Sequence, residues 1–408
     1  MNILGIVSEY NPFHNGHIYH LNASKELCNA DYSICVMSGN FSQRGTPSIV
    51  DKWSRAQMAL LGGVDLVIEL PTIYSISSAE NFSCGALKIL NSLNIVTHLS
   101  FGSECGNLEI LKEFADILYN EPKEYLTILS HELSKGLSFP KARENALLIY
   151  LNDIRKYANI LSNPNNILGI EYLKSLKQLK SKIQPITVER NSVGHNSMLV
   201  SGNIASSTNI REMISKSTDF KKYIPFETYE IIEENTKYGK IINGLETFEK
   251  EILYTFRKMS VEDIANLPDV SEGLEHAIKS AADSSSNIND FISKIKSKRY
   301  TLTRLQRIML YAILDITKND MQNSKLLKQP YVRILGMNKK GKELLSIIKY
   351  NNPKLPIITS VKDFTTKNKN KNLANMLDTD ILATNIYTLG YDFDSNCNLD
   401  YTKKIVII

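Results

Sequence analysis

Residues 1–17 read MNILGIVSEYNPFHNGH, in which a short apolar run passes through a polar turn into helical sequence that begins at Ile18. The run at residues 2–7 has the length and composition of a buried β-strand. The pattern continues with β-like runs at residues 32–37, 65–70 and 95–101 and with helical stretches that end at Asn29 and Leu61. Alternating strands and helices predict an α/β domain with a mainly parallel sheet.

The second half of the chain has a different pattern. Apolar residues recur at helical spacing in residues 245–258, 260–265 and 271–282. Two β-like runs near the end flank a helical segment, which predicts a small α/β element from about residue 328. We therefore predict two domains: residues 1–215, the catalytic α/β domain, and residues 216–408, a helix-rich domain that ends in the small α/β element.

The composition is that of an ordinary globular protein. Of 408 residues 43% are hydrophobic, and 48 Lys and Arg against 43 Asp and Glu give a formal charge of +5. This balance excludes wholesale disorder. The longest apolar run, residues 308–314, is far shorter than the roughly 18 residues that a membrane helix needs. The five cysteines are dispersed without a C-x-x-C pair, so we expect reduced thiols in a cytoplasmic protein.

The turn after the first strand holds an H-x-G-H motif, His14-Asn15-Gly16-His17. Parallel sheets bind ligands at the carboxyl ends of their strands, which is where this motif falls. Two imidazoles can donate hydrogen bonds to phosphate oxygens, Gly16 lets a nucleotide approach, and a helix N-terminus favours negative charge. The motif predicts a nucleoside triphosphate site, although two surface histidines beside an ordinary turn would give the same letters.

A second motif, Ala205-Ser206-Ser207-Thr208-Asn209-Ile210-Arg211, places hydroxyls at a helix start and an arginine one turn later. Hydroxyl and backbone N–H groups at such a start can hold the β and γ phosphates. Arg211 can neutralise charge on departing pyrophosphate. An ordinary N-cap is the alternative reading of the same serines and threonine.

Together the two motifs resemble the H-x-G-H nucleotidyltransferase superfamily, whose members let a nucleophile attack the α-phosphate of ATP. Further segments narrow the resemblance to the bacterial tRNA(Met) cytidine acetate ligase family. These segments are residues 8–17 (SEYNPFHNGH), 38–45 (SGNFSQRG), 65–71 (DLVIELP), 101–104 (FGSE), 164–172 (PNNILGIEY), 272–275 (EGLE) and 298–301 (KRYT). The resemblance implies a Rossmann-like nucleotidyltransferase domain and a ligase that activates acetate as acetyl-adenylate and acetylates the wobble cytidine of elongator tRNA(Met).

The resemblance also implies the residues of the site. His14, His17 and Arg211 are expected to be catalytic, with ATP bound as its magnesium complex and no dedicated metal site on the protein. The residues expected around ATP are Val7, Ser8, Glu9, Tyr10, Asn11, Pro12, Phe13, His14, Asn15, Gly16, His17, His20, Gly102, Asn165, Asn166, Arg190, Ser206, Ser207 and Thr208. The sequence does not separate Asn165 from Asn166 as the residue that reads adenine or ribose.

Contact with RNA is expected from a basic cluster near the chain's last third. Its members are Lys294, Lys296, Lys298, Arg299, Tyr300, Arg304 and Arg307, with no acidic residue among them. Unopposed cations beside an aromatic ring can grip phosphates and stack a base. A solvated helix face is the plainer reading of the same run.

Other polar segments are weaker candidates. Residues 43–45 (QRG) and the pair Asp51-Lys52 follow the second strand, where a functional role and a plain structural role are equally compatible with the sequence. Residues 336–343 have P-loop spacing, but Glu343 stands where a hydroxyl should bind magnesium, so we expect no P-loop. Two alternative functions stay open, a coenzyme adenylyltransferase and a nonenzymatic RNA-binding protein with a degenerate nucleotide fold.

Overall fold

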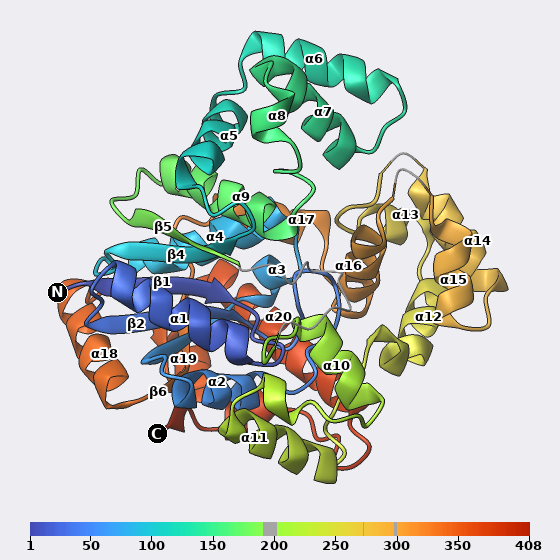
Figure 1. Cartoon of the computed structure of the whole chain (residues 1–408). Helices are drawn as coiled ribbons and strands as arrows, with labels where there is room; N and C mark the ends of the chain where they lie inside the picture. Colours follow the sequence, from blue (N-terminus) through green and yellow to red (C-terminus); the bar gives the residue numbers. More distant parts are fainter. Residues whose placement is uncertain (191–201, 272, 298–299) are drawn as a thin grey trace.

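A computed structural model describes residues 1–190, 202–271, 273–297 and 300–408. Within these residues, eight strands form one sheet in the order β5-β4-β1-β2-β3-β6-β7, with β8 paired to β6 (Figure 1). The strands are β1 (Ile3–Ser8), β2 (Tyr32–Ser38), β3 (Leu66–Leu70), β4 (His98–Ser103), β5 (Gln184–Glu189), β6 (Val332–Met337), β7 (Ile357–Ile358) and β8 (Val406–Ile407). Neighbours pair in parallel except β3 and β6, which confirms the predicted mainly parallel sheet.

Helices fill the connections and make up most of the second half, as the sequence predicts. Those of the first half are α1 (Asn15–Leu27), α2 (Lys52–Leu61), α3 (Thr72–Ser75), α4 (Ala79–Ser92), α5 (Leu108–Asn120), α6 (Lys123–Ser134), α7 (Phe139–Leu151), α8 (Ile154–Tyr157), α9 (Pro164–Gln178) and α10 (Ser207–Ser215). Those that follow are η1 (Lys221–Tyr223), α11 (Phe226–Lys237), η2 (Leu245–Phe248), α12 (Glu249–Lys258), α13 (Val261–Ala265), α14 (Leu274–Ser284), α15 (Ile288–Ile295) and α16 (Leu302–Ile313). The chain ends with α17 (Lys318–Leu326), α18 (Lys339–Asn351), α19 (Val361–Lys367), α20 (Lys371–Tyr387), η3 (Thr388–Gly390) and α21 (Leu399–Thr402). None of the described helices is long and apolar enough to cross a bilayer.

Both faces of the sheet are covered, which explains why apolar residues point to both faces of its central strands. On β2, Ile34 and Val36 pack into one hydrophobic cluster with α4 and α9, while Cys35 and Met37 pack into a second cluster with α1 and α2. Side chains alternate between the two faces of a strand, so a strand covered on both faces needs a continuous apolar run.

The predicted small α/β element near the C-terminus exists, but it extends the N-terminal sheet. β6 runs antiparallel to β3, and α18 leads from β6 to the parallel strand β7. Without β6, the buried strand β3 would be a sheet edge with unpaired backbone groups. The sheet therefore crosses the predicted boundary at residue 215, and the division into two domains stays a prediction.

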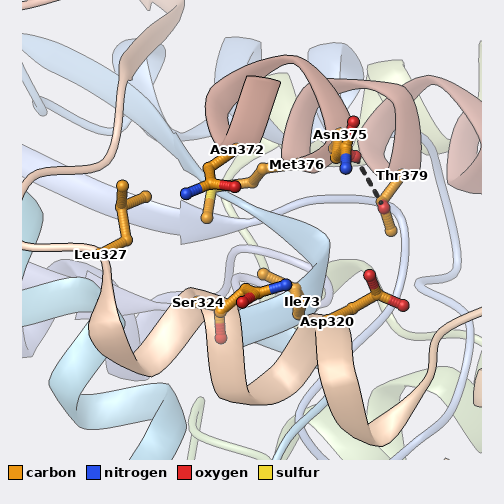
Figure 2. A pocket seen from close by; sticks show the side chains of 9 residues that line it. Ile73, Asp320, Ser324, Leu327, Asn372, Asn375, Met376 and Thr379 are labelled. Atoms are coloured by element: carbon orange, nitrogen blue, oxygen red, sulfur yellow. Dashed lines mark hydrogen bonds between the residues drawn. The ribbon is translucent and has the colours of Figure 1, made fainter. Parts of the chain in front are cut away.

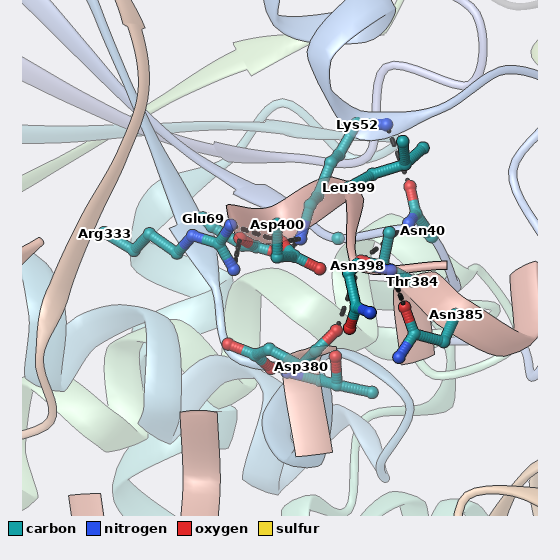
Figure 3. A network of polar contacts seen from close by, with 12 residues as sticks. Asn40, Lys52, Glu69, Arg333, Asp380, Thr384, Asn385, Asn398, Leu399 and Asp400 are labelled. Atoms are coloured by element: carbon teal, nitrogen blue, oxygen red, sulfur yellow. Dashed lines mark hydrogen bonds and ion pairs between the residues drawn. The ribbon is translucent and has the colours of Figure 1, made fainter. Parts of the chain in front are cut away.

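A buried ionic network fastens the C-terminal elements to the sheet (Figure 3). Lys52 Nζ lies 2.8 Å from Glu69 Oε1 and 2.7 Å from Asp400 Oδ1. Arg333 pairs with both carboxylates, at 3.1 Å from Glu69 Oε2. Lys52 is fully buried, and Asp51 caps α2 by accepting from Ser54 N at 2.7 Å. The pair Asp51-Lys52 thus has a structural role.

The segment with P-loop spacing is an ordinary helix start. Asn338 caps α18 by accepting from Gly341 N at 2.9 Å. A Cβ on Gly341 would lie 2.0 Å from the carbonyl oxygen of Asp65, so this glycine allows α18 to pack closely against the chain before β3. The structure thus gives this segment a role in capping and packing α18, and the absence of a P-loop stays a prediction.

Candidate active site

The H-x-G-H motif forms the turn from β1 into α1, and the backbone fixes the orientation of both imidazoles. His14 is the N-cap of α1, and its Nδ1 accepts from Gly16 N at 3.0 Å. His17 Nδ1 accepts from His14 N at 3.2 Å. A ring nitrogen that accepts from a backbone N–H carries no proton, so the neutral ring holds its proton on Nε2. Both histidines are therefore positioned as Nε2–H donors.

The two rings stack with centroids 3.7 Å apart. Tyr10 packs edge-on against the His17 ring at 4.8 Å, and Phe13 lies beside it at 5.7 Å. A Cβ on Gly16 would lie 2.9 Å from His14 Cε1, so the first reason for this glycine is room for the His14 ring. The expected space for a nucleotide at Gly16 stays a prediction.

The second motif meets the first, although 193 residues separate His14 from Ser207. Ser206 is the N-cap of α10, as in the structural alternative, and accepts from Asn209 N at 3.2 Å. Ser207 Oγ lies 3.0 Å from His14 Nε2. Arg211 donates to the Asn11 carbonyl at 2.7 Å and to Thr208 Oγ1 at 3.1 Å. The two N-termini that can bind an anion therefore lie side by side.

The other residues of the β1–α1 loop are mostly buried and hold the loop in its conformation. Tyr10, Asn11, Pro12 and Phe13 are all buried, and Asn11 Oδ1 accepts from Ile49 N at 2.8 Å. Asn15 lies at the start of α1, where its side chain donates to the carbonyls of Asn203 at 2.9 Å and Lys222 at 3.0 Å. These residues shape the loop, whereas Val7, Ser8 and Glu9 at the end of β1 are half-buried.

The charges of this region are poorly solvated. Burial, His14, Arg190 and His20 lower the pKa of His17 well below its usual value. Burial and Arg190 lower the pKa of His20 to about 4. Burial also lowers the pKa of the Arg211 guanidinium, and Arg44 adds to this effect. Neutral imidazoles beside the cationic side chains of Arg190 and Arg211 are suited to bind an anionic ligand such as a triphosphate.

The ends of β4 and β5 form the other side of the site. Arg190 follows β5, and its stem covers Gly102, where a Cβ would lie 3.1 Å from Arg190 Cγ. Arg190 Nη1 lies 3.4 Å from Asn165 Oδ1. Asn165 and Arg190 thus converge at the carboxyl edge of the sheet, together with Gly102.

The structure distinguishes the two neighbouring asparagines. Asn166 is 1% exposed, and its Oδ1 accepts from Glu104 N at 2.9 Å and Cys105 N at 3.2 Å. Its Nδ2 donates to the Ile160 carbonyl at 3.1 Å. Asn165 is only half-buried and faces Arg190. The geometry favours Asn165 as a ligand contact and gives Asn166 a structural role.

Two residues of this region were missed by the sequence analysis. Arg55 is fully buried and donates to the carbonyls of Glu9 at 2.6 Å and Ser38 at 3.1 Å, which joins the ends of β1 and β2. Glu104 caps α9 by accepting from Asn166 N at 2.9 Å and from Asn165 Nδ2 at 2.6 Å. For Arg55 the sequence holds no signal, because an arginine in an amphipathic helix is normally exposed. For Glu104 the signal is the familial segment FGSE at residues 101–104.

The loop at residues 43–45 belongs to this edge. Gln43 N donates to Glu9 Oε1 at 2.7 Å, and Arg44 acts electrostatically on Arg211. Gly45 has a φ of +76°, and a Cβ there would lie 2.5 Å from Arg307 N of α16. The loop therefore links the site to the helix-rich half of the chain.

The basic cluster differs from the expectation of unopposed charges. Lys294 pairs with Asp290 at 2.8 Å, and Arg307, only 9% exposed, pairs with Asp269 at 2.9 Å. Arg304 donates to the Asp269 carbonyl at 2.8 Å and lies over the Tyr300 ring at 4.9 Å. Asp290 lies on the same helix as Lys294 but before the run, and Asp269 lies in a distant loop, so the absence of acids within the run was misleading. Lys296 is exposed, and Lys298, Arg299 and Glu272 of the familial segments lie outside the described residues.

A separate cavity lies between α3, α17 and α20 (Figure 2). Its volume is about 30 Å³, which suffices for a water molecule but not for a nucleotide. None of the predicted site residues that the structure describes lines it. Within the described part of the chain, no three His, Cys, Asp or Glu side chains are grouped to hold a metal ion.

The parallel sheet, the H-x-G-H turn and the apposed serine-rich helix with Arg211 define a nucleotidyltransferase of the H-x-G-H class. A family model described as HIGH Nucleotidyl Transferase matches residues 1–401, and the chain belongs to this family. Within it, the chain belongs to the tRNA(Met) cytidine acetate ligase family, which confirms the resemblance seen in the sequence.

Two relatives of that name illustrate the match. The chain is 46% identical over 411 residues to the tRNA(Met) cytidine acetate ligase of Thermoanaerobacter sp. (strain X514), with 100% of both chains covered. It is 40% identical over 414 residues to that of Clostridium novyi (strain NT), with 99% of this chain and 100% of the relative covered.

Solved structures agree over the same length. The crystal structure of Thermotoga maritima TmcAL (apo, form I) matches with a TM-score of 0.95 at 34% identity. The structure of that protein bound with alpha-thio ATP (Form II) matches with a TM-score of 0.93 at 34% identity. In both cases 100% of each chain is covered.

Proposed function

We propose that this protein is an ATP-dependent ligase that acetylates the exocyclic amine of the wobble cytidine in elongator tRNA(Met). The observation that carries the proposal is the 46% identity, over the whole length of both chains, to a protein named tRNA(Met) cytidine acetate ligase. An alternative limited to coenzyme adenylylation would leave the matched second half without a role. A nonenzymatic RNA-binding protein would not need two apposed anion-binding helix starts.

The first step of the proposed reaction forms acetyl-adenylate. An acetate oxygen attacks the α-phosphate of ATP, a new O–P bond forms, and the bond to the β-phosphate breaks to release pyrophosphate. His14, His17 and Arg211 carry the donors and the positive charge on the phosphate side, where negative charge increases on the leaving group. Ser206, Ser207 and Thr208 hold the phosphates at the start of α10.

The adenosine end of ATP lies at the opposite side of the same edge in this proposal. Asn165 and Arg190 contact the nucleoside there, because their polar groups face the edge beside Gly102, where a larger residue would collide with Arg190. Asn166 supports them from the core. Magnesium enters with ATP as part of the substrate complex.

The second step transfers the acetyl group in the cytoplasm, where tRNA is found. The cytidine amine attacks the acetyl carbon, an N–C bond forms, and the C–O bond to AMP breaks. We propose that the tRNA contacts of the second half come from the exposed Lys296 and from Lys298, Arg299 and Tyr300, which follow it in the sequence. Lys294, Arg304 and Arg307 contribute less than expected from the sequence, because each is engaged within the protein.

Replacement of both histidines tests the proposal. The double variant His14→Ala, His17→Ala is expected to lose acetate-dependent exchange of pyrophosphate into ATP while retaining tRNA binding in a gel-shift assay. The variant His131→Ala, on the surface helix α6, is the matched control and is expected to exchange at the wild-type rate. Exchange at the wild-type rate in the double variant would contradict the proposed role of the motif.

A further inference from the structure

Acetyl transfer to an amine requires a proton acceptor. The cytidine amine carries two hydrogens before it attacks and one in the product, so one proton must leave as the N–C bond forms. The histidines of the H-x-G-H motif are poorly suited to take it. Their Nδ1 atoms already accept from Gly16 N and His14 N, and the proton on each ring lies on Nε2.

Glu9 is a half-buried carboxylate at the end of β1, next to this motif. One oxygen is held in place, because Glu9 Oε1 accepts from Gln43 N at 2.7 Å. Its backbone is fixed as well, since the Glu9 carbonyl accepts from the buried Arg55 at 2.6 Å. The second oxygen, Oε2, has no hydrogen-bond or ion-pair partner among the described residues. A fixed carboxylate with one available oxygen is suited to accept a proton.

The charge of Glu9 acts on both sides of the candidate site. Burial is the main cause that lowers the pKa of Arg211 on α10, and the charge of Glu9 acts in the opposite direction and raises it. After burial, it is the largest cause of the raised pKa of Tyr172 on α9. The carboxylate is therefore close enough to both helices for its charge to act on Arg211 of α10 and Tyr172 of α9. In an acetyl-adenylate the acetyl carbonyl is bonded to an oxygen of the α-phosphate, the group that connects the nucleoside with the pyrophosphate before it leaves.

Three other carboxylates near the sheet edge are already engaged. Glu104 accepts from Asn166 N and from Asn165 Nδ2 at the start of α9. Asp51 caps α2, and Glu69 belongs to the buried ionic network. A negative charge also repels acetate, so Glu9 is not suited to bind that substrate. It is suited to an amine, because glutamate accepts hydrogen bonds from the cytosine N4 amine in base recognition.

We infer that Glu9 is the general base of the transfer step, where its Oε2 accepts a hydrogen bond from the cytidine amine and then takes its proton. The inference rests on the proposed function. As the amine nitrogen bonds to the acetyl carbon, the bond from that carbon to the AMP oxygen breaks with its electron pair. The proton lost from nitrogen passes to the Glu9 carboxylate, and AMP leaves as the anion.

The variant Glu9→Gln tests this inference, because glutamine retains an oxygen for Gln43 N but cannot act as a base. The loss of acetate-dependent pyrophosphate exchange is expected to be much smaller than the loss of transfer, because acetate attacks as an anion and needs no base. Single-turnover transfer from enzyme-bound acetyl-adenylate to tRNA is expected to fall by about 100-fold or more, the usual range for a lost general base. Glu26→Gln, the same change at an exposed position of α1, is the control.

Two results would overturn the inference. Transfer at the wild-type rate in Glu9→Gln would show that no proton passes to Glu9. Equal losses of exchange and transfer, in a variant whose denaturation curve matches wild type, would place Glu9 in the phosphate site through Arg211. A wild-type protein that exchanges pyrophosphate but leaves tRNA unlabelled would instead refute the proposed function. The inference about Glu9 would then fail as well, because no cytidine amine would react.

Discussion

The neighbouring residues Asn165 and Asn166 offer the sharpest separation of binding from folding. In Asn166→Ala, the backbone N–H groups of Glu104 and Cys105 and the carbonyl of Ile160 lose their partner inside the protein. Each buried group left unsatisfied costs about 1–2 kcal/mol, so the free energy of unfolding is expected to fall by about 3–6 kcal/mol.

Asn165→Ala removes a side chain that is half-buried and contacts Glu104 and Arg190. Water can replace these contacts, so the free energy of unfolding is expected to stay within about 1 kcal/mol of wild type. The affinity for ATP is expected to fall about tenfold, which corresponds to about 1.4 kcal/mol.

Urea denaturation followed by circular dichroism measures the first effect, and calorimetric titration with ATP measures the second. Each variant is the control for the other, because both changes are Asn to Ala at adjacent positions of one helix. A destabilised Asn165→Ala protein together with a stable Asn166→Ala protein that binds ATP weakly would refute the assignment of the two residues.

Three further predictions concern the buried charges. Asp400→Ala leaves Lys52 and Arg333 with Glu69 alone, so urea denaturation should show a loss of about 3–5 kcal/mol, and a loss under about 1 kcal/mol would contradict the network. Burial and Glu69 raise the pKa of Asp380 to about 7, so the folded state binds the proton more tightly than the unfolded state does. The stability that Asp380 contributes below about pH 4 should be lost as the pH rises toward 7, and Asp380→Asn should flatten this part of a stability–pH curve. The pKa of His20 in the folded protein, about 4, is below its value in the unfolded chain. The wild-type protein should therefore lose stability as the pH falls from about 6.5 to 4. His20→Asn should reduce the loss of stability measured between pH 7 and pH 5.

Much of the α/β half could be predicted from local patterns. β1, β2 and β3 are apolar runs covered on both faces, and such runs are visible without tertiary information. The two phosphate-side motifs were also found, because histidines, a glycine and hydroxyls stand together at predicted helix starts. The structure added their meeting at the contact of Ser207 with His14.

The missed features depend on contacts that no local pattern encodes. Nothing near residue 332 indicates that β6 pairs antiparallel with β3. The sequence suggests that Arg55 is exposed, whereas in the structure it is buried and donates to carbonyls at the ends of β1 and β2. The charges of the basic cluster were wrongly predicted to be unopposed for the same reason, because Asp269, which pairs with Arg307, lies in a distant loop.

The most direct test of the central claim is the product of the complete reaction. Purified protein is incubated with magnesium-ATP, radiolabelled acetate and unfractionated bacterial tRNA, and the digested nucleosides are separated by chromatography. We predict label in acetylcytidine only when ATP is present, and none with the His14→Ala, His17→Ala variant. Unlabelled tRNA, in reactions whose protein still exchanges pyrophosphate into ATP, would contradict it.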